Sequence, residues 1–96
     1  MNLDAMTIEK INQVFKQEEK IKNTLLFGSR AKGTAKKGSD IDLAIIGDDL
    51  TFRDICKLGM KIDELDLPYK IDIVDYNAIT NNELKEHIDR VCISLI

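Results

Sequence analysis

The sequence contains no tryptophan, one proline and only two cysteines. Proline-rich and glycine-rich segments are missing, which excludes collagen-like and low-complexity chains and leaves the composition of a globular protein. Two cysteines are too few for a disulfide scaffold, and no Cys/His spacing typical of a zinc site is present. We therefore expect Cys56 and Cys92 to be small buried residues in a reducing compartment. His87, the single histidine, is expected to be an ordinary residue on a helix face.

Long apolar runs are also absent. The longest, Leu43–Ile46, is far too short to span a bilayer. The first residues lack the basic stretch and apolar core of a signal peptide, so we expect a cytoplasmic protein. A length of 96 residues predicts one domain, spanning 1–96, with a single core and no room for a separate substrate-binding domain.

Charge is mildly acidic overall, with a formal net charge of −3, which argues against a dedicated duplex-binding protein or a DNA template. The distribution is more informative than the sum. Between residues 20 and 39 there is no acid, and the six basic residues are Lys20, Lys22, Arg30, Lys32, Lys36 and Lys37. From Asp40 onward acids predominate. This segregation suits a phosphate-rich, metal-bound ligand, although it is also typical of a solvated basic loop.

Hydrophobic periodicity predicts alternating helices and strands. Helices are expected from Ile8 with Thr7 as the cap, from Phe52 with Thr51 as the cap, and from a capping box at Thr80–Glu83 through Leu95. Strands are expected at Thr24–Phe27, Ser39–Ile46 and Tyr69–Val74, with a turn or short helix over Ser29–Ala35. In the helix after Thr51, the predicted buried stripe is Phe52, Ile55, Cys56, Gly59 and Ile62. The fold class is therefore α/β, with a small mixed sheet flanked by helices.

Two aspartates stand out in the second predicted strand. Asp40 and Asp42 share one face because side chains alternate along a strand, and their Cα atoms are about 6.5–7 Å apart. Carboxylates that close repel unless a cation or proton lies between them. Two magnesium ions about 3.5–4 Å apart would fit the gap. The alternative is that this pair simply faces solvent.

Asp72 is an acid inside an otherwise apolar strand. A carboxylate buried there without a partner would be costly. If that strand lies beside the Asp40–Asp42 strand in register, Asp72 completes a site of three carboxylates. Asp72 is thus the candidate third metal ligand.

Gly28 and Ser29 break the chain directly after the first apolar strand. A missing side chain lets backbone N–H groups approach an anion, and the serine hydroxyl and a following helix N-terminus add donors. The basic residues that could neutralise triphosphate charge are Arg30, Lys32, Lys36 and Lys37. Each feature alone is ordinary, but a strand, a Gly-Ser turn and a later Ser-Asp-x-Asp form a specific combination.

Gly28–Gly33 with Ser39–Leu43 resembles the signature of the DNA polymerase β-type nucleotidyltransferase superfamily. The sequence is most similar to its minimal nucleotidyltransferase (MNT) branch. The resemblance implies the polymerase β-like nucleotidyltransferase core. It also implies transfer of a nucleoside monophosphate, AMP from ATP in our interpretation, to a hydroxyl with the help of two Mg²⁺ ions.

The resemblance also assigns roles to individual positions. Gly28 and Ser29 would hold the β- and γ-phosphates. Asp40 and Asp42 would ligate both metal ions, and Asp72 would ligate the catalytic metal and orient the acceptor oxygen. The expected nucleotide-binding residues are Gly28, Ser29, Arg30, Lys32 and Ser39.

The chain departs from larger members of the superfamily in size, because it has no second domain to shape the acceptor pocket. Minimal members resemble half of a two-protein module whose other half is an all-helical HEPN protein. The resemblance therefore implies an antitoxin that adenylylates a tyrosine of a HEPN toxin partner. Two alternatives stay open: nucleotidylation of a small hydroxylated molecule, aminoglycoside-like, with a partner subunit, and a non-catalytic antitoxin that binds and occludes its partner.

Overall fold

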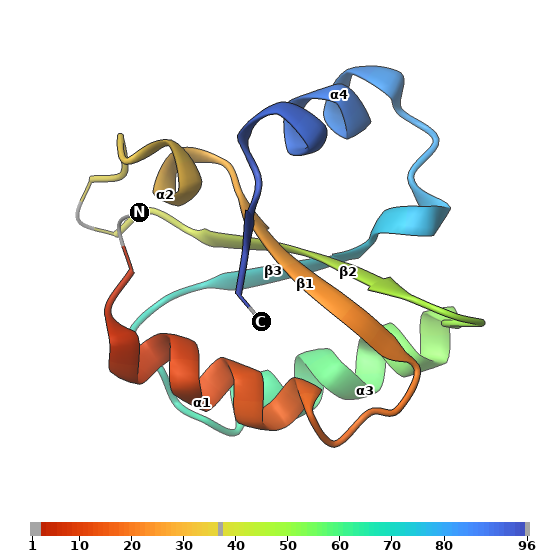
Figure 1. Cartoon of the computed structure of the whole chain (residues 1–96). Helices are drawn as coiled ribbons and strands as arrows, with labels where there is room; N and C mark the ends of the chain where they lie inside the picture. Colours follow the sequence, from red (N-terminus) through yellow and green to blue (C-terminus); the bar gives the residue numbers. More distant parts are fainter. Residues whose placement is uncertain (1–2, 37, 96) are drawn as a thin grey trace.

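The computed structural model describes residues 3–36 and 38–95, which form a four-stranded sheet between helices (Figure 1). The elements follow in the order α1 (Ala5–Phe15), β1 (Ile21–Phe27), α2 (Ser29–Lys32), β2 (Ile41–Gly47), α3 (Phe52–Asp63), β3 (Ile71–Asp75), the 3-10 turn η1 (Tyr76–Ala78), α4 (Asn82–Val91) and β4 (Ile93–Ser94). In Figure 1, α1 and α3 run along one side of the sheet, α4 lies on the other, and α2 lies at the end of β1. None of the described helices is long and apolar enough to cross a membrane.

The sheet has the strand order β3-β2-β1-β4. β2 pairs antiparallel with β1 and parallel with β3, and β4 pairs antiparallel with β1. The predicted mixed sheet flanked by helices is therefore confirmed. The parallel pair requires a crossover, which α3 supplies between β2 and β3. This crossover brings the Asp72 strand next to the Asp42 strand.

Alternation along β2 separates two apolar clusters. Ile41, Leu43 and Ile45 are fully buried in the larger cluster with the inward faces of α1 and α3. Ala44 belongs to a smaller cluster beneath α4, together with Leu25, Phe27 and Ile88. Asp42 has the same strand parity as Ala44, so its carboxylate lies on the thinly covered face. The larger core thus anchors β2 while its opposite face stays available for chemistry.

Two predicted helix starts are wrong by one or more residues. α1 begins at Ala5, because Asp4 caps it and accepts a hydrogen bond from the Thr7 backbone N–H at 3.1 Å. α4 is capped by Asn81 rather than Thr80, and its side chain accepts from the first-turn N–H groups. Asp and Asn cap helices at least as well as Thr. Asp4 and Asn81 therefore take the place of the predicted threonine caps, because their side chains accept hydrogen bonds from the first-turn N–H groups.

The predicted buried stripe of α3 is also partly wrong. Phe52 is 84% exposed and Cys56 is exposed, whereas Leu58 and Ile62 are buried in the main core. A side chain added at Gly59 would meet nothing within 4 Å, so this glycine marks no close contact with the sheet. The inward face of α3 is offset from the predicted one. Cys92 is half-buried, which leaves the expectation of two buried cysteines incorrect.

The last predicted helix ends earlier than expected. α4 stops at Val91, and Cys92 adopts an extended conformation. Ile93 and Ser94 then form β4, where Leu26 pairs with Ile93 and the Leu95 N–H donates to the Thr24 carbonyl at 2.9 Å. Leu95 is buried in the main core. Backbone pairing with the edge of β1 therefore outweighs the helical spacing of this residue.

The capping box of α3 leads to a pH-dependent prediction. Asp54 accepts hydrogen bonds from Lys20 Nζ at 2.9 Å and from the Thr51 N–H at 3.0 Å, and these contacts lower the pKa of Asp54 to about 2. A pKa below the ordinary 3.8 means that the ionised carboxylate stabilises the fold above pH 3.8, and that this stabilisation is lost as pH falls toward 2. Asp54→Asn should therefore lower Tm by a few degrees at pH 7, measured by circular dichroism.

The difference in Tm between Asp54→Asn and wild type should become smaller as the pH falls from 4 to 2. Asp48→Asn is the matched control, because the ion pair of Asp48 with Lys22 is longer, at 3.6 Å, and mostly exposed. Its Tm should stay close to that of wild type. Equal Tm values for Asp54→Asn and wild type at pH 7 would contradict the assignment.

Candidate active site

The Gly-Ser turn lies where β1 meets α2. Gly28 has φ 75° and ψ −156°, a backbone conformation that L side chains rarely adopt, and it is the N-cap of the four-residue helix Ser29–Lys32. Gly33, with φ 78°, ends this helix. The predicted turn with a short helix limited by Gly33 is confirmed. Two glycines thus fix the position of Ser29 at the end of a buried strand.

Asp42 lies directly against this turn. It pairs across the sheet with Phe27, the residue before Gly28. A Cβ built on Gly28 would lie 2.5 Å from Asp42 Oδ2, so only glycine leaves room for the carboxylate. Asp42 is half-buried. The turn and the carboxylate are therefore parts of one compact unit.

Asp72 lies beside Asp42 as predicted. The parallel register of β2 and β3 places the two aspartates opposite each other. Asp72 is exposed, while Ile71 and Ile73 on either side pack against the main core. Asp40, in contrast, precedes the first residue of β2, so the predicted strand start at Ser39 is wrong.

The three carboxylates are close enough for their charges to interact. Burial raises the pKa of the Asp42 carboxyl, and the negative charges of Asp72 and Asp40 raise it further. Among residues 3–36 and 38–95, no three His, Cys, Asp or Glu side chains already converge as a metal-ligand set. The donors are nevertheless all carboxylate oxygens, which magnesium prefers, and a divalent cation would relieve their repulsion. The chemistry of these donors, rather than their convergence, therefore suits a divalent ion.

The basic residues of the loop divide into buried and exposed groups. Arg30 is only 6% exposed, and its Nε and Nη2 donate to the Ser39 carbonyl at 3.1 and 2.8 Å. Its guanidinium lies 4.6 Å from the centre of the Tyr69 ring. Lys32 and Lys36 are exposed, and Lys37 falls outside the described residues. Lys32 is thus free to meet a ligand, whereas Arg30 is held within the protein.

Ser39 contributes its backbone and its side chain to the loop. The carbonyl accepts from Arg30, and Ser39 Oγ accepts a hydrogen bond from the Lys36 N–H at 2.9 Å. Because Ser39 immediately precedes Asp40, the hydrogen bonds that hold Ser39 in the loop also determine the position of the Asp40 backbone. The structure therefore brings Ser39 to the site as part of the loop framework.

His87 is a residue that the sequence analysis did not connect with the site. It is half-buried on α4, and its ring meets Phe27 edge-on with centroids 6.2 Å apart. Its positive charge would act on Asp42 in the opposite sense to the acids, lowering the pKa of that carboxyl. Strand alternation could have placed Phe27 on the Asp42 face, but not the helix that covers it.

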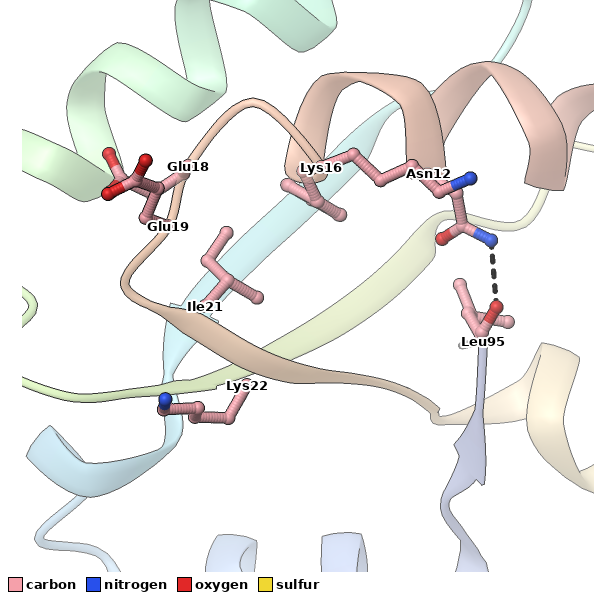
Figure 2. Close-up of a pocket in the computed structure, with 8 residues that line it drawn as sticks. Asn12, Lys16, Glu18, Glu19, Ile21, Lys22 and Leu95 are labelled. Carbon is pink, nitrogen blue, oxygen red and sulfur yellow. Dashed lines mark hydrogen bonds between the residues drawn. The ribbon is translucent and has the colours of Figure 1, made fainter.

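Two pockets lie away from the carboxylates. One, of about 490 Å³, lies between the end of α1 and the start of β1, where Asn12 Nδ2 donates to the Leu95 carbonyl at 2.7 Å (Figure 2). The other, of about 520 Å³, lies beside β3 and the N-terminal ends of α3 and α4. Neither pocket is lined by Asp40, Asp42 or Asp72. The acids therefore do not form part of either pocket.

Known proteins are similar to this chain in sequence and in fold. A Haemophilus influenzae protein described as a probable protein adenylyltransferase, MntA, is 46% identical over 66 residues, which are 68% of this chain and 57% of that protein. A chain in the crystal structure of a toxin–antitoxin complex with AMP-PNP has a TM-score of 0.76 and 27% identity, covering 93% of this chain and 72% of that one.

A third similar chain comes from a complex of tri-AMPylated Shewanella oneidensis HEPN toxin with MNT antitoxin. Its TM-score is 0.71 at 23% identity, covering 95% of this chain and 70% of that one, and it supports the fold. The matched segment spans less than two thirds of the Haemophilus relative. Residues 9–96 match the family described as polymerase beta, nucleotidyltransferase. The protein therefore belongs to the polymerase β nucleotidyltransferase family.

Proposed function

We propose that the protein is an antitoxin that transfers AMP from ATP to a tyrosine hydroxyl of a HEPN toxin, with Mg²⁺ as cofactor. The observation that carries the proposal is the position of Asp42, held between the Gly28 turn and Asp72. This arrangement combines a place for phosphates with adjacent carboxylates. Phosphoryl transfer depends mostly on positioning and charge neutralisation, and such a set of groups would supply both.

Each residue then has a distinct role. Gly28 and Ser29 present backbone and hydroxyl donors to the β- and γ-phosphates, and Lys32 adds a cation from the exposed side of α2. Asp40 and Asp42 would hold the metal ions. When bound, these ions supply charge neutralisation and a more nucleophilic acceptor oxygen.

Asp72 would complete the metal site from β3 and orient the acceptor hydroxyl. Its exposure is consistent with this role, because a tyrosine of another protein must approach from solvent. Neither of the two pockets described above is lined by the acids, which favours a large acceptor over a small molecule held in a closed cavity.

The nature of the partner is supported by similarity. The relative MntA is described as a protein adenylyltransferase, and the toxin–antitoxin neighbour was crystallised with an ATP analogue. The helical partner would supply the acceptor tyrosine.

Purified protein, candidate partner and ATP labelled at the α-phosphate test the proposal. We expect Mg²⁺-dependent label on the partner, which EDTA abolishes and excess Mg²⁺ restores. Label on an added aminoglycoside instead would identify a small-molecule transferase. A tight complex that carries no label and resists EDTA would indicate neutralisation by occlusion and contradict an enzymatic role.

Asp72→Asn tests the third metal ligand. The amide keeps an oxygen but loses the charge, so we expect transfer to slow about 30-fold, equivalent to about 2 kcal/mol of transition-state stabilisation. The label-transfer rate at saturating ATP and Mg²⁺ measures the effect. Asp75→Asn is the control, because Asp75 caps η1 at the far end of the same strand. An unchanged rate in Asp72→Asn would show that Asp72 holds no metal.

A further inference from the structure

Among residues 3–36 and 38–95, Arg30 is the only buried side chain that carries a charge. Burying a guanidinium is costly unless its donors and its charge are compensated. Here Nε and Nη2 both donate to the Ser39 carbonyl, and the face of the group lies over the Tyr69 ring. Such charge-assisted bonds are stronger than neutral ones, and a desolvated cation–π contact adds to them.

These contacts join three segments that carry the proposed catalytic groups. Arg30 itself belongs to α2, next to Ser29 of the phosphate turn. Ser39 immediately precedes Asp40. Tyr69 lies three residues before Asp72, and a backbone bond from the Ile41 N–H to the Lys70 carbonyl, 2.9 Å long, joins the same two strand starts.

We infer that Arg30 is a positioning residue, which fixes Asp40 and Asp72 relative to the phosphate turn through Ser39 and Tyr69. This inference deepens the proposed function and rests on it. In this assignment the guanidinium acts through its contacts with Ser39 and Tyr69, and not through the nucleotide. Lys32, two residues later on the exposed side of the same short helix, is the cation that meets the phosphates.

The two roles have different kinetic consequences. Removal of a cationic side chain that binds phosphate raises KM for ATP. A positioning residue that is removed displaces the carboxylates, and displacement of about 1 Å can cost about 100-fold in rate. We therefore expect Arg30→Gln to lower kcat about 100-fold and to weaken Mn²⁺ binding to the ATP-loaded protein at least about tenfold, with KM for ATP within about threefold. Mn²⁺ affinity is measured by electron paramagnetic resonance.

Tyr69 gives an independent route to the same effect. Tyr69→Leu removes the ring under the guanidinium and should lower kcat about tenfold, whereas Tyr69→Phe keeps the ring and should stay near wild type. The double variant Arg30→Gln/Tyr69→Leu should be no slower than Arg30→Gln alone, because both substitutions break one connection. Lys32→Gln is the matched control on α2, and it should raise KM with little change in Mn²⁺ affinity.

Backbone amide chemical shifts of Asp40 and Asp72 provide a readout that does not depend on activity. They should move in Arg30→Gln and Tyr69→Leu and stay unchanged in Lys32→Gln, with circular dichroism confirming that each variant is folded. Unchanged shifts in Tyr69→Leu, or a higher KM with unaltered kcat in Arg30→Gln, would overturn the inference. Failure of the proposed function has a different signature: wild type would transfer no label, while the amide shifts would still decide the role of Arg30.

Discussion

Asp42→Asn should slow nucleotidyl transfer about 1,000-fold and, at the same time, raise the thermal stability of the metal-free protein. The carboxylate is half-buried beside Asp72 and near Asp40, and its proposed role is to hold both metal ions. Loss of about 4 kcal/mol of charge stabilisation in the transition state corresponds to about a 1,000-fold slower rate. The label-transfer assay at saturating ATP and Mg²⁺ measures this loss.

The stability change has the opposite sign because burial and the neighbouring acids raise the pKa of Asp42. A carboxyl with a raised pKa in the folded state binds its proton more tightly there than in the unfolded chain. The ionised group therefore destabilises the fold above its folded pKa, and this cost is absent below 3.8. Asp42→Asn removes the cost at neutral pH, so its Tm in EDTA should exceed that of wild type.

The gain in Tm should shrink as pH falls toward 3.8, where the wild-type carboxyl is itself protonated. Asp49→Asn is a suitable comparison, because Asp49 lies in an exposed turn remote from the acid face. A lower Tm for Asp42→Asn than for wild type in EDTA would mean that the carboxylate is held by favourable contacts. Full transfer activity in this variant would refute the catalytic assignment.

Gly28→Ala should have the second largest effect on the transfer rate, because it disturbs both the phosphate turn and Asp42. The added Cβ would lie 2.5 Å from Asp42 Oδ2, and φ of 75° is strained for any residue with a side chain. Either the turn or the carboxylate must move. We expect a rate about 100-fold lower and a loss of about 2–3 kcal/mol in the free energy of unfolding.

Gly38→Ala is a control that separates the effect of backbone strain from the effect of a steric clash with Asp42. Gly38 has φ 87°, but a Cβ there would meet nothing within 4 Å. This substitution should cost about 1 kcal/mol through the backbone alone and change the rate by less than about threefold. Urea denaturation and label transfer measure the two quantities. Equal rate losses in both variants would show that the close approach of Gly28 to Asp42 has no role in catalysis.

Local patterns in the sequence were sufficient for most of the fold. Alternation along β2 puts Ile41, Leu43 and Ile45 on one face, and all three are buried in the main core. The sheet was correctly expected to be mixed. The errors arose where two patterns competed. The spacing of Leu95 continued the helical stripe of α4. In the structure, however, Ile93 and Ser94 pair with the edge of β1 and form β4. Such pairing depends on residues about 70 positions apart, which periodicity does not register.

The site was predictable to the extent that it follows from strand geometry. The pairing of Asp42 with Asp72 required only that two strands be adjacent in register, and the structure places them so. The burial of Arg30 was not predictable, because a cation in a basic stretch is typical of a solvated loop. Tyr69, whose ring lies against the Arg30 guanidinium, is 39 positions away in the sequence, and the crossover through α3 brings the two together. Contacts of this kind emerge only from the tertiary structure.

The parallel pairing of β2 with β3 also sets the order in which the site can form during synthesis. When the ribosome has released β2, the chain contains the Gly28 turn and Asp42, but no neighbour for that edge of the strand. α3 must first be made and cross over before Asp72 can take its position. The third carboxylate is therefore the last to arrive, and a nascent chain that ends before β3 lacks a complete site.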